Sequence, residues 1–412
     1  MRGVLAGLVA VAFATVLPAA TSSHPAQACS GYIGWYEFSP TGHWIAYANE
    51  IPRGTVPNCR TIQELDVMRT DGTGRRRLVR GVFEFSWSPR TDLLAMSVYN
   101  PAGTENDLRI LNPKGGRVRV RARSGEVRSW AWSPDGRWIG LVRSGQLLTG
   151  RLGEPGLNIL GRPGDDFAFS PDGRWLAFSR YAGSVPALIL LHPDGTGKRV
   201  LASGVGPAWS PSGKWISFYR WDGNEVGAYA IHPDGTGLRP LFTGSCVWLD
   251  WSPAEDVVAV RHGCYRPGWT NPETDVVDVT EGTSWTLGSG RATWSPTGQR
   301  LVLEQRTQAS QSLSIVHVDG THAAKVDALG FLGFYGWSPN GRQFAVSYGR
   351  RIQLVPDDGR ARRHNFAIGA GPAWSPAGRR IAYTQKQRVP CGQVLMIKGL
   401  RDEFGHPLAR CG

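Results

Sequence analysis

The sequence predicts an all-β fold, a single β-propeller built from four-stranded blades. A decapeptide of the form WSPDGRWIGL recurs along the chain, and an Asp-Gly turn follows several of its copies at a similar distance. Outside the N-terminal segment, no stretch carries the 3.6-residue apolar period of a long helix. Self-similarity at about 40 to 45 residues is a sequence signature of propeller blades. The nine copies are FSPTGHWIAY (38–47), WSPRTDLLAM (87–96), WSPDGRWIGL (132–141), FSPDGRWLAF (169–178), WSPSGKWISF (209–218), WSPAEDVVAV (251–260), WSPTGQRLVL (294–303), WSPNGRQFAV (337–346) and WSPAGRRIAY (374–383).

The number of copies sets the number of blades. The motif prolines are 37 to 49 residues apart, and the chain after residue 28 provides about 43 residues per copy. We therefore expect nine blades, or eight if one degenerate copy (87–96 or 251–260) is absorbed as an irregular hairpin. No linker rich in proline and serine divides the chain, so we expect one closed ring, which a strand exchanged between its ends could close.

The repeat at 205–242 shows why each element forms. A short apolar run leads into Ser210-Pro211-Ser212-Gly213, where proline presets φ for the turn and glycine accepts a positive φ. Aromatic and β-branched residues then mark a buried strand. A loop is expected at 221–224, and Asp234-Gly235 between two apolar runs is a strong hairpin signal. The expected strands are 205–209, 214–219, 227–232 and 238–242.

The Trp-Ser-Pro-Asp-Gly turn, together with the later Asp-Gly turn, resembles the TolB-like (WD40-like) β-propeller repeat. The resemblance covers essentially all of 31–411 and implies a propeller fold. This chain differs from the family's namesake in two ways, which limit what the resemblance implies. The family's namesake has a small α/β domain before a propeller of six blades, whereas the repeats here begin close to the N-terminal segment and number nine. For this reason the resemblance assigns no functional residue to this chain.

The N-terminal segment predicts export. Met1-Arg2, an apolar run to about Ala20, and Ala26-Gln27-Ala28 read as a signal peptide at 1–28 that is cleaved before Cys29, which leaves a propeller domain at 29–412. An uncleaved anchor and lipid attachment at Cys29 are the alternatives. After signal removal no segment approaches 18 apolar residues, so we expect no transmembrane segment and a secreted or extracytoplasmic protein of the cell envelope.

Six cysteines remain after cleavage, and an even number in an exported chain predicts disulfides. Their order suggests local pairs, although six cysteines allow 15 connectivities. A metal site is a weak alternative, because no C-x-x-C spacing occurs. The suggested pairs are Cys29–Cys59, Cys246–Cys264 and Cys391–Cys411.

Basic residues exceed acidic residues by 13, with 46 Lys and Arg against 33 Asp and Glu. Such a surplus is compatible with anionic partners, or with arginines spread over a solvated rim. Export argues against nucleic acid, and we expect a monomer whose partner is a protein or a cell-envelope polymer. Arginine clusters at 75–77, 117–123 and 360–363 fall on or beside predicted outer strands, where charge resists edge-to-edge aggregation or forms an anion-binding rim.

Candidate binding residues lie where the repeats differ. In a propeller the tight turns share one face, and the longer loops share the other. The expected long loops are 49–60, 99–107, 261–274 and 385–392. Variable loops on a rigid scaffold commonly carry binding. The longest loop combines aromatic, cationic and amide groups and is either a binding loop or a structural insertion; its candidates are Tyr265, Arg266, Trp269 and Asn271.

The first strand of each blade is expected to face the central channel. The residue three positions before the motif aromatic should then lie near the channel mouth on the loop side. These residues either line a pocket for a polar ligand or a peptide, or simply line a wet channel. The candidates are Trp35, Glu84, Asp166, Trp248, Arg291 and Phe334.

The sequence favours binding over catalysis. It has no G-x-S-x-G nucleophile elbow and no S-x-D-x-G sialidase box. His192 and His232 share one repeat position before a turn, so we interpret them as turn residues rather than metal ligands, and we expect no cofactor. The predicted function is an exported, non-enzymatic propeller that binds through its variable loops. The alternative is a carbohydrate-active hydrolase or lyase with Glu84 and Asp166 at the channel mouth.

Overall fold

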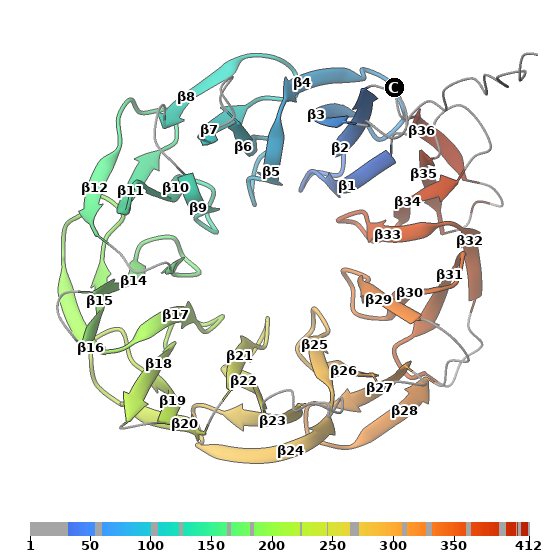
Figure 1. The fold of residues 1–412 in the computed structure, drawn as a ribbon. Coiled ribbons are helices and arrows are strands. Elements are labelled where there is room, and N and C mark those ends of the chain that lie inside the picture. The colour runs from blue at the N-terminus through green and yellow to red at the C-terminus, as the bar shows by residue number, and fades with distance from the viewer. Residues whose placement is uncertain are drawn as a thin grey trace, which may run out of the picture.

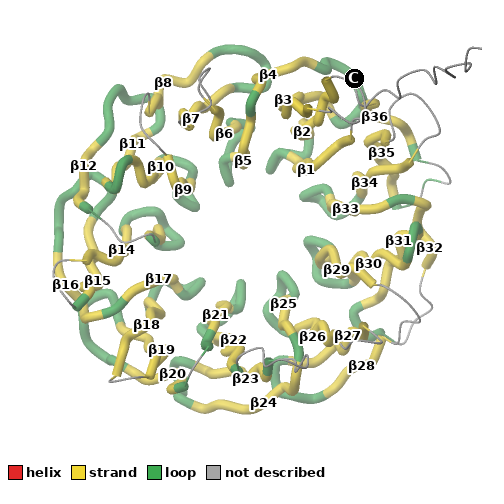
Figure 2. The backbone as a smooth tube through the Cα atoms, viewed as in Figure 1, coloured by secondary structure: helices red, strands yellow, loops and turns green. Residues whose placement is uncertain are grey.

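The computed structural model shows nine four-stranded sheets arranged as a ring around a central axis (Figure 1). Within the described part of the chain, every regular element is a strand (Figure 2). The predicted all-β propeller is therefore confirmed, with nine blades rather than eight. The described residues are 32–53, 60–99, 106–122, 127–162, 166–181, 185–222, 225–244, 246–263, 272–306, 311–326, 332–359, 364–386, 393–400, 402 and 405–410.

The four strands of each blade pair in sequence order from the centre of the ring to its rim (Figure 1). The strands nearest the channel are β1 (Tyr32–Phe38), β5 (Val82–Trp87), β9 (Val127–Trp132), β13 (Phe167–Phe169), β17 (Val205–Trp209), β21 (Trp248–Trp251), β25 (Arg291–Trp294), β29 (Leu332–Trp337) and β33 (Ala370–Trp374). The second strands are β2 (Trp44–Arg53), β6 (Leu94–Tyr99), β10 (Trp138–Arg143), β14 (Leu176–Tyr181), β18 (Ile216–Asp222), β22 (Val257–His262), β26 (Arg300–Arg306), β30 (Gln343–Tyr348) and β34 (Arg380–Lys386).

The third strands are β3 (Arg60–Arg69), β7 (Asn106–Leu111), β11 (Gln146–Arg151), β15 (Pro186–Leu191), β19 (Glu225–Ile231), β23 (Glu273–Asp278), β27 (Gln311–His317), β31 (Arg351–Pro356) and β35 (Gln393–Gly399). The outer strands are β4 (Arg76–Arg80), β8 (Arg117–Ala122), β12 (Asn158–Gly161), β16 (Arg199–Ser203), β20 (Arg239–Thr243), β24 (Thr283–Ser289), β28 (His322–Val326), β32 (His364–Ile368) and β36 (His406–Arg410). We number the blades one to nine in chain order.

The two degenerate copies of the motif each form a blade of their own. The copy at 87–96 ends β5 and begins β6, and the copy at 251–260 does the same for β21 and β22. Neither copy is absorbed as an irregular hairpin, because each belongs to a complete four-stranded sheet.

The strands extend further into the expected loops than the sequence indicates. In blade five, β18 and β19 pair as far as Asp222 with Glu225, so residues 221–222 of the loop expected at 221–224 are strand. In blade one, β2 and β3 pair as far as Arg53 with Arg60, which corrects the expected loop at 49–60. Antiparallel pairing persists because every second residue pair of an extended ladder can exchange further backbone hydrogen bonds.

The hydrophobic core lies between the blades rather than within one of them. Nine clusters of buried side chains each join two successive blades, and the ninth joins the last blade to the first. Between blades four and five, for example, Leu188 and Leu190 pack with Phe218. Alternating residues of a strand point to opposite sides of its sheet, so one strand supplies both neighbouring clusters. Full burial of such a side chain contributes roughly 1.5–3 kcal/mol.

The motif tryptophan ties its blade to the preceding one. In six blades its Nε1–H donates to the backbone carbonyl of the residue just before the preceding motif aromatic, at 2.9–3.4 Å. Trp251 differs, because its Nε1–H donates to the Ser217 hydroxyl at 2.9 Å. The six donor and acceptor pairs are Trp87–Glu37, Trp132–Ser86, Trp209–Ala168, Trp294–Asp250, Trp337–Thr293 and Trp374–Gly336.

The motif serine and glycine shape the turn that follows. In blade three the buried Ser133 hydroxyl accepts the Trp138 amide at 2.9 Å and donates to the Asp135 carboxylate at 2.5 Å. Gly136 has φ of +70°, and a Cβ on it would lie 2.9 Å from Oγ of Ser88 in blade two. Glycine is therefore required both by the backbone conformation and by the close approach of the neighbouring turn.

Noncovalent contacts close the ring between blades nine and one. Both blades are continuous in sequence, so the strand exchange considered above does not occur. The Ile33 amide donates to Oε1 of Gln393 at 3.2 Å, and the Tyr36 hydroxyl donates to the Gly371 carbonyl. Because Phe38 replaces the motif tryptophan in blade one, Tyr36 supplies the link that an indole supplies elsewhere.

The predicted signal peptide at 1–28 lies outside the described residues and stays a prediction. Within the part of the chain that the structure describes, no helix is long and apolar enough to cross a membrane.

Candidate functional site

The ring has two different faces. The turn face carries the tight turns between first and second strands and between third and fourth strands. The loop face carries the connections between second and third strands and between successive blades. Each strand runs from one face to the other, so the first residues of a first strand and the last residues of a second strand both lie at the loop face.

The longest predicted binding loop lies largely outside the described residues, and so do its candidates Tyr265, Arg266, Trp269 and Asn271. The base of this loop is described. His262 and Glu273 are paired across β22 and β23, and Nε2 of His262 lies 2.9 Å from the Asp275 carboxylate. The Phe242 ring stacks on His262 with ring centres 4.3 Å apart. These contacts fix where the loop leaves and re-enters the blade.

Cys246 is the described cysteine, and it is disulfide-bonded. It has a φ of +59°, an unusual conformation for a residue other than glycine. Its predicted partner Cys264 lies outside the described residues, so this pairing stays a prediction. The pairings of Cys29 with Cys59 and of Cys391 with Cys411 stay predictions for the same reason.

The channel-mouth candidates lie on or beside the innermost strands. Trp35, Glu84, Trp248 and Arg291 are exposed residues of β1, β5, β21 and β25, and the exposed Asp166 directly precedes β13. Phe334 lies on β29, where it pairs with Val346. Four of these candidates fall into two sectors of the ring instead of one site, whereas Asp166 in blade four and Phe334 in blade eight lie outside both sectors.

The first sector spans blades one and two. Trp35 stacks on Phe85 with ring centres 5.9 Å apart and an interplanar angle of 19°. Phe83 meets Tyr99 edge-on, also at 5.9 Å. Glu84 lies between the two phenylalanines in sequence and is exposed, so this sector is aromatic with an acidic group.

The second sector spans blades five to seven. The Arg261 guanidinium lies over the Trp248 ring, 4.9 Å from its centre. Partial desolvation at the channel wall raises the pKa of Asp250, and the positive charges of Arg261 and Arg291 oppose this rise. The Tyr219 hydroxyl accepts the Leu249 amide at 3.0 Å. This sector therefore combines an indole, two guanidinium groups and a carboxyl group.

Sequence reasoning selected Trp248 and Arg291 but missed Tyr219, Asp250 and Arg261. Arg261 was detectable, because it stands opposite Trp248 once the two strands of blade six are paired in register. Asp166 is linked to this sector, since its negative charge raises the pKa of Tyr219, although burial of the phenol is the larger cause.

Glu37, on the innermost strand β1, has a raised pKa that the sequence did not predict. Partial desolvation raises the pKa of Glu37 to about 7, and a backbone N–H of Trp87 opposes the rise. Glu37 and Asp250 each directly precede a motif aromatic, so they occupy the same repeat position in blades one and six. In both carboxyl groups partial desolvation is the largest cause of the raised pKa.

The arginine cluster at 75–77 begins the outer strand β4, as predicted, but its charges are largely paired. Arg75 lies 2.9 Å from the buried Asp66, and Arg77 lies 2.5 Å from the buried Glu64. Arg80 also contacts Glu64, at 2.8 Å. A structural role therefore accounts for this cluster better than an anion-binding rim.

His192 and His232 act as turn residues, as predicted. The Nδ1 atoms lie 2.9 Å from the carbonyls of Arg174 and Lys214, and the rings stack on Trp175 and Trp215. Within the described residues, no group of three His, Cys, Asp or Glu side chains could hold a metal ion.

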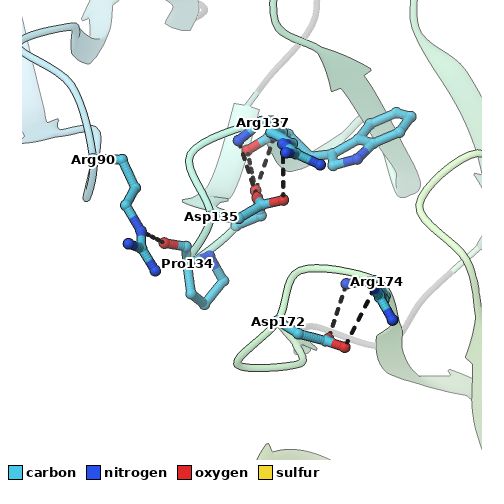
Figure 3. Close-up of polar contacts among 8 residues, drawn as sticks. Arg90, Pro134, Asp135, Arg137, Asp172 and Arg174 are labelled. Carbon is cyan, nitrogen blue, oxygen red and sulfur yellow. Dashed lines mark hydrogen bonds and ion pairs between the residues drawn. The ribbon is translucent and has the colours of Figure 1, made fainter.

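The turn face also carries a depression of about 740 Å³ between blades three and four. Figure 3 shows Asp135 with Arg137 and Asp172 with Arg174 on adjacent turns at this place, and Nε of Arg90 donating to the Pro134 carbonyl at 3.4 Å. No sequence pattern predicted a hollow on this face. We call it the turn-face depression.

Comparison with solved structures shows the same fold in several proteins. A eukaryotic initiation factor superposes with a TM-score of 0.55 and 14% identity over 76% of this chain and 82% of that one. Dipeptidyl peptidase 4 of Porphyromonas gingivalis superposes with a TM-score of 0.53 and 10% identity, over 81% of this chain and 59% of that one. TolB from Acinetobacter baumannii superposes with a TM-score of 0.37 and 18% identity, over 69% of this chain and 82% of that one. At such low identity the first two matches show the fold alone, and nothing is concluded from the third, whose TM-score is 0.37.

No protein-family model and no curated protein sequence matches this chain. A function therefore has to be argued from its own residues.

Proposed function

We propose that this chain is an exported, non-enzymatic β-propeller that binds a protein or another component of the cell envelope through its loop face. The observation that carries this proposal is the distribution of exposed aromatic side chains. Seven of the eight exposed aromatic residues in the described part of the chain lie within the first or last two residues of a strand, at its loop-face end. The eighth, Trp35, lies midway along β1. The eight are Tyr32, Trp35, Phe83, Tyr99, Tyr181, Trp221, Trp248 and Tyr348.

Exposed aromatic surface is costly in water unless a partner covers it. Phe83 is 54% exposed and Trp248 is 41% exposed, although a buried position between blades is available to most aromatic residues of this fold. Exposed apolar patches on otherwise polar surfaces commonly mark protein interfaces. Trp, Tyr and Arg are also the side chains most often found at interface hot spots. The loop face offers all three types, with Arg261 held over Trp248.

Export is supported by the sequence at 1–28 and by the cysteines. Cys246 is disulfide-bonded. Disulfides form and persist chiefly in oxidising compartments outside the cytosol.

The enzymatic alternative receives less support from the geometry. Glycoside hydrolysis requires two carboxyl groups about 5 to 9.5 Å apart. Glu84 stands on blade two and Asp166 on blade four, and β9 of blade three lies between them (Figure 1). These two candidates are therefore not neighbours, and binding remains the function that we propose.

Site-specific crosslinking in intact cells tests the proposal. A photoreactive amino acid at Tyr99 on the loop face should capture a defined partner, whereas the same group at Val200 on the outer strand β16 should not. The captured partner, once purified, should bind the full chain directly, and Phe83→Ser should weaken this binding while Val200→Ser leaves it unchanged. Identical captures at both positions, or binding that Phe83→Ser does not affect, would refute the proposal.

A further inference from the structure

The turn-face depression breaks the regularity of the repeats. Its walls come from two adjacent blades, and both carry charged groups of either sign. Blade three contributes its first tight turn and the facing ends of β10 and β11. Blade four contributes the corresponding turn and the turn that follows β15. The residues that line the depression include Asp135, Trp138, Arg151, Asp172, Arg174 and Asp194.

Trp138 is the residue whose environment differs from its equivalents. Trp175 and Trp215 occupy the same repeat position in blades four and five. The imidazole of His192 covers Trp175 with ring centres 3.9 Å apart, and that of His232 covers Trp215 at 3.8 Å. On these indoles a guanidinium also lies over the ring, from Arg199 and Arg239 respectively.

In blade three the residue opposite the tryptophan is Arg151 instead of histidine. Its guanidinium turns away to Glu154, 2.6 Å distant. Within the described residues, neither a ring nor a guanidinium stacks on Trp138. The indole packs against the buried cluster between blades three and four, remains only partly buried, and lines the depression with its exposed part.

The three aspartates of the depression keep hydrogen-bonding capacity for a ligand. In each of them Oδ1 is occupied, because it accepts bonds from a turn hydroxyl and from a backbone amide. Oδ2 of Asp135 and of Asp172 lies 3.8 and 3.9 Å from the nearest arginine Nε, which is beyond hydrogen-bond distance. Hydrogen bonds from the Thr196 hydroxyl and amide lower the pKa of Asp194, so this group is an ionised acceptor at neutral pH.

The arrangement selects a class of ligand. The carboxylates repel an anion and the arginines repel a cation. A neutral molecule with many hydroxyl groups can form hydrogen bonds with both kinds of side chain. Hydroxyl groups donate to carboxylates and accept from guanidinium groups in strong, charge-assisted hydrogen bonds. The negative face of an indole attracts the weakly positive C–H groups of a sugar ring. We propose that the turn-face depression binds a neutral saccharide, with Trp138 as the stacking surface and Asp135, Asp172 and Asp194 as hydroxyl acceptors.

This site lies on the opposite face from the proposed partner-binding surface and uses none of its residues. The two proposals can therefore fail independently of each other.

The full chain should be screened against an array of neutral gluco-, manno-, galacto- and N-acetylglucosamine oligomers, and hits titrated by saturation-transfer NMR and tryptophan fluorescence. Saturable binding of at least one oligomer is expected. Arg151→His introduces the covering imidazole found in blades four and five, and it should weaken binding about tenfold or more. Asp194→Asn keeps the turn but loses a charged acceptor, and a similar loss is expected.

Asp234→Asn is the matched control. Asp234 accepts the same two bonds from Thr236 in blade five, outside the depression, so its replacement should leave affinity unchanged. Circular dichroism and thermal melting confirm that each variant is folded. The proposal is overturned if no oligomer binds saturably, or if folded Arg151→His and Asp194→Asn bind as well as the Asp234→Asn control.

Discussion

The guanidinium of Arg261 lies 4.9 Å from the centre of the Trp248 ring, and the two residues stand directly opposite each other on β22 and β21. Cross-strand pairing fixes both backbones, so the indole and the cation form one preorganised surface at the channel mouth. Asp250, two residues after Trp248, experiences the positive charge of the same arginine. Arg261 therefore contacts the indole and also lowers the pKa of Asp250, an effect that it shares with Arg291.

Removal of Arg261 should change the titration of Asp250. Partial desolvation already raises the pKa of this carboxyl, and Arg261 is the first of two charges that oppose the rise. In Arg261→Ala the pKa of Asp250 should therefore move further upward, as followed by carbon-13 NMR of the carboxyl group. Arg239→Ala, which removes a cation over Trp215 at the turn-face side of blade five, should leave it unchanged. An unshifted Asp250 in Arg261→Ala would contradict the coupling.

The indole hydrogen bonds between blades should contribute measurably to stability. In Trp209→Phe the bond from Nε1 to the Ala168 carbonyl, 3.1 Å long, is lost while an aromatic ring remains. We expect a loss of about 1 kcal/mol in the free energy of unfolding, measured by urea denaturation. Blade four shows that phenylalanine fits the position, because Phe169 stands there. Trp221→Phe, at an exposed loop-face position, should cost far less.

The motif glycine should resist replacement for two separable reasons. Gly136 and Gly153 both have positive φ, of +70° and +85°. A Cβ on Gly136 would also lie 2.9 Å from Oγ of Ser88, whereas nothing lies within 4 Å of a Cβ on Gly153. Backbone strain alone costs about 1–3 kcal/mol. Gly136→Ala should thus lower the unfolding free energy more than Gly153→Ala, and equal losses in urea titrations would refute the contribution of the close approach.

Glu37 should make stability depend on pH near neutrality. Its pKa is about 7 in the folded chain, against an ordinary value of 4.5. Between these two values the folded state binds more protons than the unfolded state, so stability falls as pH rises from about 4.5 to about 7 and then levels off. Glu37→Gln should flatten this part of the profile of melting temperature against pH. An unchanged slope in the variant would show that another group is responsible.

The fold was predictable because its signal is repeated nine times. A single WSPDG turn is a weak indication, but the spacing of nine copies defines the blades, and even the degenerate copies at 87–96 and 251–260 keep enough pattern to form strands. Strand ends were less predictable. Trp221 and Asp222 look like loop residues in sequence, yet they pair with β19 because the neighbouring strand continues.

The candidate sites were predictable only in part, because they depend on which blades become neighbours in the ring. Position within the repeat selected Trp248 and Arg291 as channel-mouth candidates, and each is the first residue of an innermost strand. The role of Arg261 required the register of two strands. The turn-face depression was missed because Arg151 looks like an ordinary strand residue until its blade is compared with the histidine-bearing blades beside it.

The absence of an exchanged strand at the closure has a consequence for the connectivity of the molecule. Every described sheet is complete within one stretch of chain, and the junction between blades nine and one is held by contacts of the same kind as other junctions, such as Tyr36 with Gly371. The position of the chain ends is thus independent of the packing. A circular permutant with its ends moved to the connection between β16 and β17 would retain all nine sheets and all nine interblade clusters.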